Sequence, residues 1–166
     1  MTGETVFLYH RQNDTGNLPV DKYHVQLINI DENENALKAA RAWTEDNEHL
    51  YPVLRFGEDK IFATVFNPDR RTFARLMGDT TEAAKELPKP TVYHAGKCLG
   101  CERLKYWLTQ RNIDFELVNI GLDTPAGDKL AQWSGGRRVV PTIDFPGVAR
   151  FFNPPMELME RLVGLA

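Results

Sequence analysis

Hydrophobic and polar positions follow one another along this chain in an order that occurs twice, with roughly ninety residues between equivalent positions. Each time, a short apolar run is followed by a helical pattern containing a tryptophan, then by an apolar run with a proline near its start, and then by an Asn-Pro pair. In chain order the matched features are 25–30 with 115–120, Trp43 with Trp133, 51–56 with 140–145, and Asn67-Pro68 with Asn153-Pro154. The repetition predicts two units of the same α/β design.

Each unit is expected to contain a strand, a helix, a second strand, a second helix, a hairpin of two strands and a closing helix. Strands that alternate with helices indicate parallel pairing, so each unit should form a mixed four-stranded sheet flanked by helices. The closing helices should begin at the Asn-Pro pairs, with Asn as N-cap and Pro at the first helical position, and should stop at Gly78 and Gly164.

The two units differ at their first helix. The second unit has about twenty residues between its first two strands, whereas the first unit has only residues 10–24, interrupted by Gly16 and Pro19. A parallel crossover needs about a dozen residues or more. The first helix of the first unit is therefore expected to be short, displaced or replaced by a loop.

The boundary between the units is predicted at residues 79–89, a polar segment that ends in Pro88 and is followed by Pro90. This places the first unit at 1–78 and the second at 90–166. The first unit contains no cysteine, so it cannot carry out dithiol chemistry.

The composition is that of a soluble globular chain, with 42% hydrophobic and 26% charged residues among 166. A net charge of −3 without a basic stripe gives no reason to expect a nucleic-acid partner. The chain has no basic, apolar leader at its start and no stretch of membrane-spanning character. We therefore expect a cytoplasmic protein that does not contact membranes.

The only two cysteines, Cys98 and Cys101, have the C-x-x-C spacing of a dithiol that cycles with a disulfide. A structural disulfide is a poor explanation in a reducing cytoplasm. Cys98 should lie at the N-terminus of a helix, beside Lys97, and both the helix dipole and the cation favour the thiolate. Cys101 should lie one turn further in and be more buried. We therefore expect Cys98 to attack and Cys101 to resolve.

Residues 91–165 resemble a glutaredoxin, and among glutaredoxins they are most similar to the mycoredoxin or actinobacterial-type branch. The resemblance implies a thioredoxin fold and, with the internal repeat, tandem thioredoxin-like domains of which the first is a degenerate copy. It also implies reduction of disulfides or mixed disulfides, with catalysis by Cys98. The motifs that carry it are Thr91-Val92-Tyr93, Cys98-x-x-Cys101, the segment 134–142 and Asn153-Pro154.

The resemblance further implies a substrate site around Pro141. In this family the proline is cis and turns the backbone of the preceding residue, here Val140, toward the reactive sulfur, where it can pair with an extended partner. A plain edge-strand proline is the alternative. Arg138 occupies the family's arginine position, and Lys97 and Arg137 offer further contacts to an anionic substrate.

Glutathione, mycothiol or a similar low-molecular-weight thiol would be the reductant, and no bound cofactor is expected. The chain departs from the common family pattern at Leu99 and Gly100 between the cysteines, at Ala95, and at 151–154 in place of a Gly-Gly-x-Asp motif. The resemblance therefore does not select one thiol. Protein disulfides and small-thiol mixed disulfides are both expected partners.

Two alternatives remain open from the sequence. The dithiol could belong to a non-catalytic redox sensor or interaction module, which would be oxidised once instead of turning over. Cys98 could also hold a metal or iron–sulfur cluster shared between two chains. A zinc site within one chain is not expected, because the four histidines are scattered and provide no paired-ligand spacing.

Overall fold

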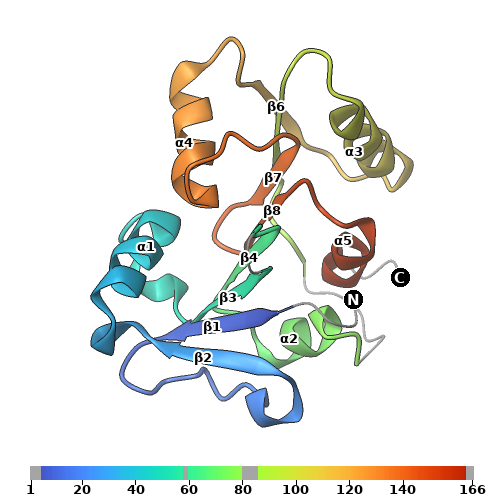
Figure 1. The fold of residues 1–166 in the computed structure, drawn as a ribbon. Helices are drawn as coiled ribbons and strands as arrows, with labels where there is room; N and C mark the ends of the chain where they lie inside the picture. Colours follow the sequence, from blue (N-terminus) through green and yellow to red (C-terminus); the bar gives the residue numbers. More distant parts are fainter. Residues whose placement is uncertain (1–4, 58–59, 80–85, 164–166) are drawn as a thin grey trace.

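The computed structural model describes residues 5–57, 60–79 and 86–163. They form one mixed sheet of eight strands in the order β2-β1-β3-β4-β8-β7-β5-β6, with helices on both faces (Figure 1). The strands are β1 Val6–His10, β2 Val25–Asn29, β3 Val53–Phe56, β4 Ala63–Phe66, β5 Thr91–His94, β6 Glu116–Asn119, β7 Thr142–Phe145 and β8 Ala149–Phe152. The α-helices are α1 Glu34–Thr44, α2 Arg70–Leu76, α3 Leu99–Gln110, α4 Thr124–Ser134 and α5 Met156–Val163. The expected mixed α/β architecture with a thioredoxin-like arrangement is confirmed.

The strand order is the same when read inward from either edge of the sheet. β2-β1-β3-β4 on one side mirrors β6-β5-β7-β8 on the other, with one parallel pair at each edge and antiparallel pairs elsewhere. We call residues 5–79 the first half and residues 86–163 the second half. The halves differ where the short crossover was expected: the fully described stretch 11–24 forms a single 3-10 turn, η1 Val20–Lys22, where the second half has α3.

The two halves are joined through β4 and β8, so the chain does not form two separate four-stranded sheets. The strands pair antiparallel, with Ala63 opposite Phe151, Thr64 opposite Arg150 and Val65 opposite Ala149. Every residue of both strands is buried. An apolar edge strand leaves its backbone N–H and C=O groups unpaired, and joining the edges satisfies these groups in both halves at once.

A single hydrophobic core extends across both halves on the sheet face that is covered by α2, α3 and α5 (Figure 1). It includes Leu54 and Phe73 from the first half and Leu104, Phe151 and Leu158 from the second. On the opposite face, α1 and α4 each cover a smaller cluster of their own, built around Trp43 and Trp133 respectively. The repeated tryptophans are therefore core residues.

Two buried arginines lie between these smaller clusters, near the centre of the sheet. Arg55 stacks on Trp43, with 3.7 Å from its Cζ to the ring centroid, and donates to the carbonyl oxygen of Trp133. Arg150 stacks on Trp133 at 3.8 Å and donates to the carbonyl oxygen of Trp43. Each arginine thus contacts one tryptophan ring and the backbone of the other half.

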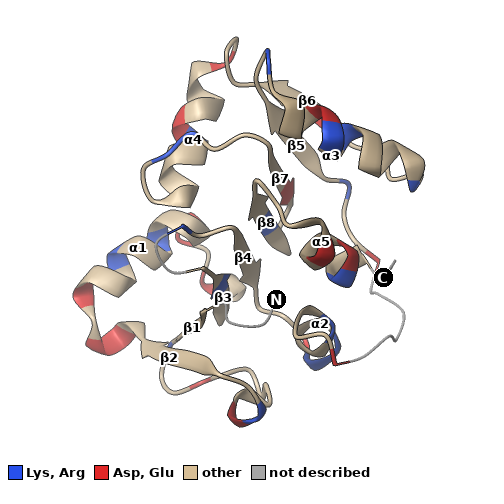
Figure 2. Cartoon of the chain, turned by 45° about the vertical axis from the view of Figure 1, so that its right-hand side comes forward, with Lys and Arg blue, Asp and Glu red and all other residues tan. Residues whose placement is uncertain are grey.

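The arginines pair differently on their own hairpins. Arg55 donates to Thr64 Oγ1 over 3.1 Å, whereas Arg150 faces Asp144 across 3.3 Å. Figure 2 shows this pair as a blue position on β8 beside a red one on β7. Burial lowers the pKa of Arg55 to about 9 and also lowers that of Arg150, while burial raises the pKa of Asp144 against the opposing effect of Arg150.

The closing helices do not begin at the Asn-Pro pairs as the sequence suggested. Asn67 and Asn153 have left-handed backbone conformations, with φ of 39° and 45°, and form a turn before each helix. α2 is capped instead by Asp69, whose carboxylate accepts from the N–H of Thr72 at 2.7 Å. The asparagines are thus turn residues, and the N–H of each donates to the carbonyl oxygen of the proline that precedes β3 or β7.

Candidate functional site

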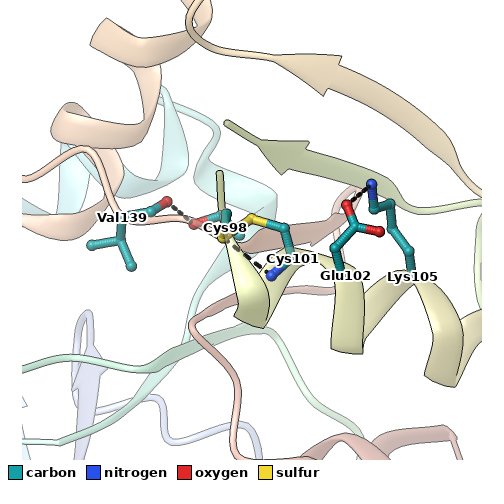
Figure 3. The surroundings of a disulfide bond; sticks show 6 residues. Cys98, Cys101, Glu102, Lys105 and Val139 are labelled. Atoms are coloured by element: carbon teal, nitrogen blue, oxygen red, sulfur yellow. Dashed lines mark hydrogen bonds and ion pairs between the residues drawn. A yellow bond between two sulfur atoms is a disulfide. The ribbon is translucent and has the colours of Figure 1, made fainter. Parts of the chain in front are cut away.

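The dithiol lies at the N-terminus of α3, where the sequence placed it. Cys98 is the N-cap residue of the helix and is half-buried, while Cys101 lies in the first turn and is 0% exposed. The two form a disulfide with their Cα atoms 5.2 Å apart (Figure 3). Cys98 Sγ also accepts from the backbone N–H of Cys101 at 3.1 Å. A thiolate formed at Cys98 would face this donor and the positive end of the helix dipole.

Buried side chains along one face of α3 fix the position of this helix end. Leu104, Trp107 and Leu108 follow Cys101 at helical spacing and are buried against the sheet. Leu99, between the cysteines, is 73% exposed. The buried sulfur of Cys101 therefore lies on the core side of the dithiol, and Cys98 lies on the accessible side.

The wall opposite the dithiol is formed by the start of β7. The peptide bond between Val140 and Pro141 is cis, which agrees with the family-based expectation. A Cβ atom added at Gly100 would lie 3.2 Å from Pro141 Cδ and 3.7 Å from Asn153 Oδ1. The N–H of Asn153 in turn donates to the carbonyl oxygen of Pro141 at 2.7 Å. The dithiol loop, the cis proline and the turn before α5 are thus in mutual contact.

The three predicted cationic residues lie in different surroundings. Arg138 pairs with Asp128 of α4, and its guanidinium covers Gly127, where a Cβ atom would lie 3.2 Å from Arg138 Cζ. Lys97 and Arg137 are exposed and form no ion pair within the described part of the chain. These two cations are free to contact an anion, whereas Arg138 would have to exchange its partner.

Residues of the first half approach this site, which the sequence did not reveal. A cleft of about 360 Å³ has Lys60, Ile61 and Phe62 on one wall and Arg137, Val139 and Asn153 among the residues of the other. The Asn153-Pro154 pair is recognisable in the sequence, but there it indicates the start of a helix and not a part of this site. Nothing in the spacing of Lys60 indicated that the hairpin between β3 and β4 reaches the other half.

The first half has the same backbone arrangement without the thiols. The peptide bond between Tyr51 and Pro52 is cis, and the N–H of Asn67 donates to the carbonyl oxygen of Pro52 at 2.9 Å. A Cβ atom at Gly16 would lie 3.3 Å from Pro52 Cγ, so the loop after β1 packs there as Gly100 packs on Pro141. Arg11 of this loop is held by Asp31 and Glu48.

The described residues contain no group of three His, Cys, Asp or Glu side chains arranged to hold a metal ion. Their helices include none with the length and apolar character needed to cross a bilayer.

Comparison with known proteins matches the segment that carries this site. The glutaredoxin family model matches residues 91–148, which run from β5 past the dithiol and β7 to the turn before β8. Two curated proteins of Mycobacterium tuberculosis, from strains CDC 1551 / Oshkosh and ATCC 25618 / H37Rv, are both named "Putative glutaredoxin". Each is 34% identical to this chain over 77 residues, which covers 46% of this chain and 92% of the relative.

Proposed function

The chain belongs to the glutaredoxin family, and we propose that it is a thiol–disulfide oxidoreductase that reduces protein disulfides or mixed disulfides through Cys98 and Cys101. The observation that carries this proposal is the placement of the pair: a half-buried cysteine at a helix N-terminus, a fully buried partner one turn away, and a cis proline opposite. Lys97, Arg137 and Arg138 assist by contacting anionic groups of the substrate, and Val140 and Pro141 by binding its backbone.

The first step forms a mixed disulfide. The Cys98 thiolate attacks one sulfur of the substrate disulfide, so that an S–S bond forms to Cys98 Sγ while the substrate's own S–S bond breaks. The other sulfur leaves as a thiolate and takes a proton from water. The N–H of Cys101 and the helix N-terminus stabilise the attacking anion.

Two routes complete the cycle. In the dithiol route, the Cys101 thiolate attacks Cys98 Sγ and releases the second substrate thiol, so the two electrons gained by the substrate come from the enzyme pair. Two molecules of a low-molecular-weight thiol then reduce the enzyme disulfide and are oxidised to their own disulfide. In the monothiol route, one such thiol attacks the mixed disulfide directly and Cys101 is not needed.

The first half is, in this proposal, a degenerate copy of the second. Support comes from the mirrored strand order, the cis bond before Pro52 and the bond from the N–H of Asn67 to the carbonyl oxygen of Pro52. Without cysteines it contributes packing across β4 and β8 in place of thiol chemistry. Deleting residues 1–78 is not a clean test, because the core is shared.

Turnover distinguishes this proposal from a sensor. Reduction of a small mixed disulfide should be measured for the wild type, Cys98→Ser and Cys101→Ser, with glutathione, mycothiol and a dithiol as alternative reductants. Loss of turnover in Cys98→Ser is expected in every case. Activity that persists in Cys101→Ser assigns the monothiol route, and loss in both variants assigns the dithiol route. A wild type that is oxidised once and never turns over would refute the enzyme proposal.

A further inference from the structure

The cleft beside the dithiol is built by both halves of the chain, and this gives the cysteine-free half a role at the site. Its volume of about 360 Å³ lies within the range of small-molecule sites, roughly 300–1,000 Å³. It adjoins the loop of the reactive pair through Asn153, whose Oδ1 would lie 3.7 Å from a Cβ atom at Gly100.

The first-half wall of this cleft is held firmly against the second half. The N–H of Phe152 donates to the carbonyl oxygen of Phe62 at 2.9 Å, and the N–H of Phe62 donates to the carbonyl oxygen of Phe56 at 3.1 Å. Ile61 packs against the same hydrophobic cluster of the second half as Val139. These contacts continue the pairing of β4 with β8 by one residue, so the wall, which lies just before β4, is anchored to the sheet at Phe62.

The chemistry of the cleft favours a small anion with an apolar body. Lys60 approaches from the first half and Arg137 from the second, and within the described part of the chain neither forms an ion pair. Ile61, Phe62 and Val139 supply an apolar surface between these cations. A carboxylate held by the two cations would leave the rest of a small thiol on this surface, near Cys98.

We propose that Lys60 of the cysteine-free half, together with Arg137, binds the anionic group of a low-molecular-weight mixed disulfide and so sets substrate preference at Cys98. The inference rests on the proposed oxidoreductase function. The duplicated half would then complete the substrate site instead of repeating the chemistry. An acidic segment of a protein substrate is the competing occupant, and the small cleft volume argues against it.

The test compares two disulfides of similar length that differ in charge. One is 3,3′-dithiodipropionate, which carries two carboxylates, and the other is the neutral 2-hydroxyethyl disulfide. The ratio of their KM values should shift against the anionic substrate by about threefold in Lys60→Gln and about tenfold in Lys60→Glu, the size expected of a partly exposed ion pair and of its reversal. The matched control, Lys38→Glu on the exposed face of α1, makes the same charge change outside the cleft.

The inference is overturned if Lys60→Glu leaves the KM ratio unchanged or if Lys38→Glu shifts it equally. A loss confined to the reduction of a protein disulfide also overturns it, because it assigns the cleft to an acidic protein segment.

A binding measurement separates failure of this inference from failure of the proposed function. The thioether 3,3′-thiodipropionate cannot be reduced, so its binding to the wild type can be followed by amide chemical shifts even without turnover. Amide shifts at Val139 and Asn153 on binding, together with an affinity about tenfold weaker in Lys60→Glu, support the cleft whether or not the protein proves to be an enzyme. Unperturbed amides at both positions in the wild type, with an unchanged KM ratio, would overturn it.

Discussion

Replacing Arg150 by methionine should destabilise the fold strongly, because it leaves a buried carboxylate without its partner. Arg150 is 6% exposed, and it contacts Asp144, the Trp43 carbonyl oxygen and the Trp133 ring. Methionine keeps much of the stem but none of the donors. Removing one member of a buried ion pair costs about 3–5 kcal/mol, and the orphaned Trp43 carbonyl falls within that loss. We therefore expect Arg150→Met to lower the free energy of unfolding by about 3–5 kcal/mol.

The second change, Asp144→Leu, should recover most of this loss. With both charges gone, the site becomes apolar and no buried charge is left alone, a replacement that is often neutral or stabilising. A double-mutant cycle built on urea unfolding gives the coupling energy between the two residues directly. The matched control is Arg138→Met, which removes an exposed ion pair with Asp128 and should cost within about 1 kcal/mol.

The pH dependence of Arg150→Met has a defined sign. Burial raises the pKa of Asp144 and Arg150 opposes that rise, so removing Arg150 raises the folded-state pKa further. The folded variant then binds more protons than the unfolded chain above the unfolded pKa of about 3.9, and its stability falls as pH rises through the folded pKa. The loss of unfolding free energy in Arg150→Met relative to the wild type should therefore be smallest near pH 4 and grow toward neutrality. A deficit below about 1 kcal/mol, or one independent of pH, would refute the reasoning.

Two further predictions concern the dithiol loop and the junction of the halves. Gly100→Ala places a Cβ atom 3.2 Å from Pro141 Cδ, so it should displace the dithiol loop and lower kcat/KM about tenfold. Gly96→Ala is the control, because the space around Gly96 is open and its kcat/KM should not change. Steady-state kinetics with a small mixed disulfide compares the two variants. Phe151 lies opposite Ala63 at the junction, and Phe151→Ala should lower the free energy of unfolding by about 3–5 kcal/mol. Because the core is shared, calorimetry should show both halves unfolding in one transition at a lower Tm. Two separate transitions would contradict a single cooperative unit.

The local elements could be predicted from the sequence because their signals are local. The period of apolar residues after Cys101 and the tryptophans at matching distances were sufficient to place helices on a sheet. The joining of β4 to β8 could not be predicted, since it pairs Thr64 with Arg150, two polar residues that would ordinarily be assigned to a solvent-exposed face. Their burial depends on partners from elements remote in the chain, such as Trp43 and Trp133.

In the candidate site, too, some residues could be identified from local sequence patterns and others are placed only by the tertiary fold. Cys98, Cys101 and Pro141 could be identified because spacing within a few residues and a family motif carry them. The contact of Gly100 with Asn153 and the approach of Lys60 depend on how three distant segments fold together, which no local pattern encodes. The asparagine turns also had two possible meanings in sequence, a helix cap or a left-handed turn, and the cap is supplied two residues later in α2.

The central claim is that Cys98, and not Cys101, attacks the substrate sulfur, and trapping the mixed disulfide tests it most directly. Cys101→Ser and Cys98→Ser are each mixed with 2-hydroxyethyl disulfide, quenched with acid over a time course, and weighed by intact-mass spectrometry. The account predicts rapid gain of one mercaptoethanol unit on Cys101→Ser and little or none on Cys98→Ser, whose remaining thiol at Cys101 is 0% exposed. Equal rates in the two variants, or faster reaction of Cys98→Ser, would contradict it.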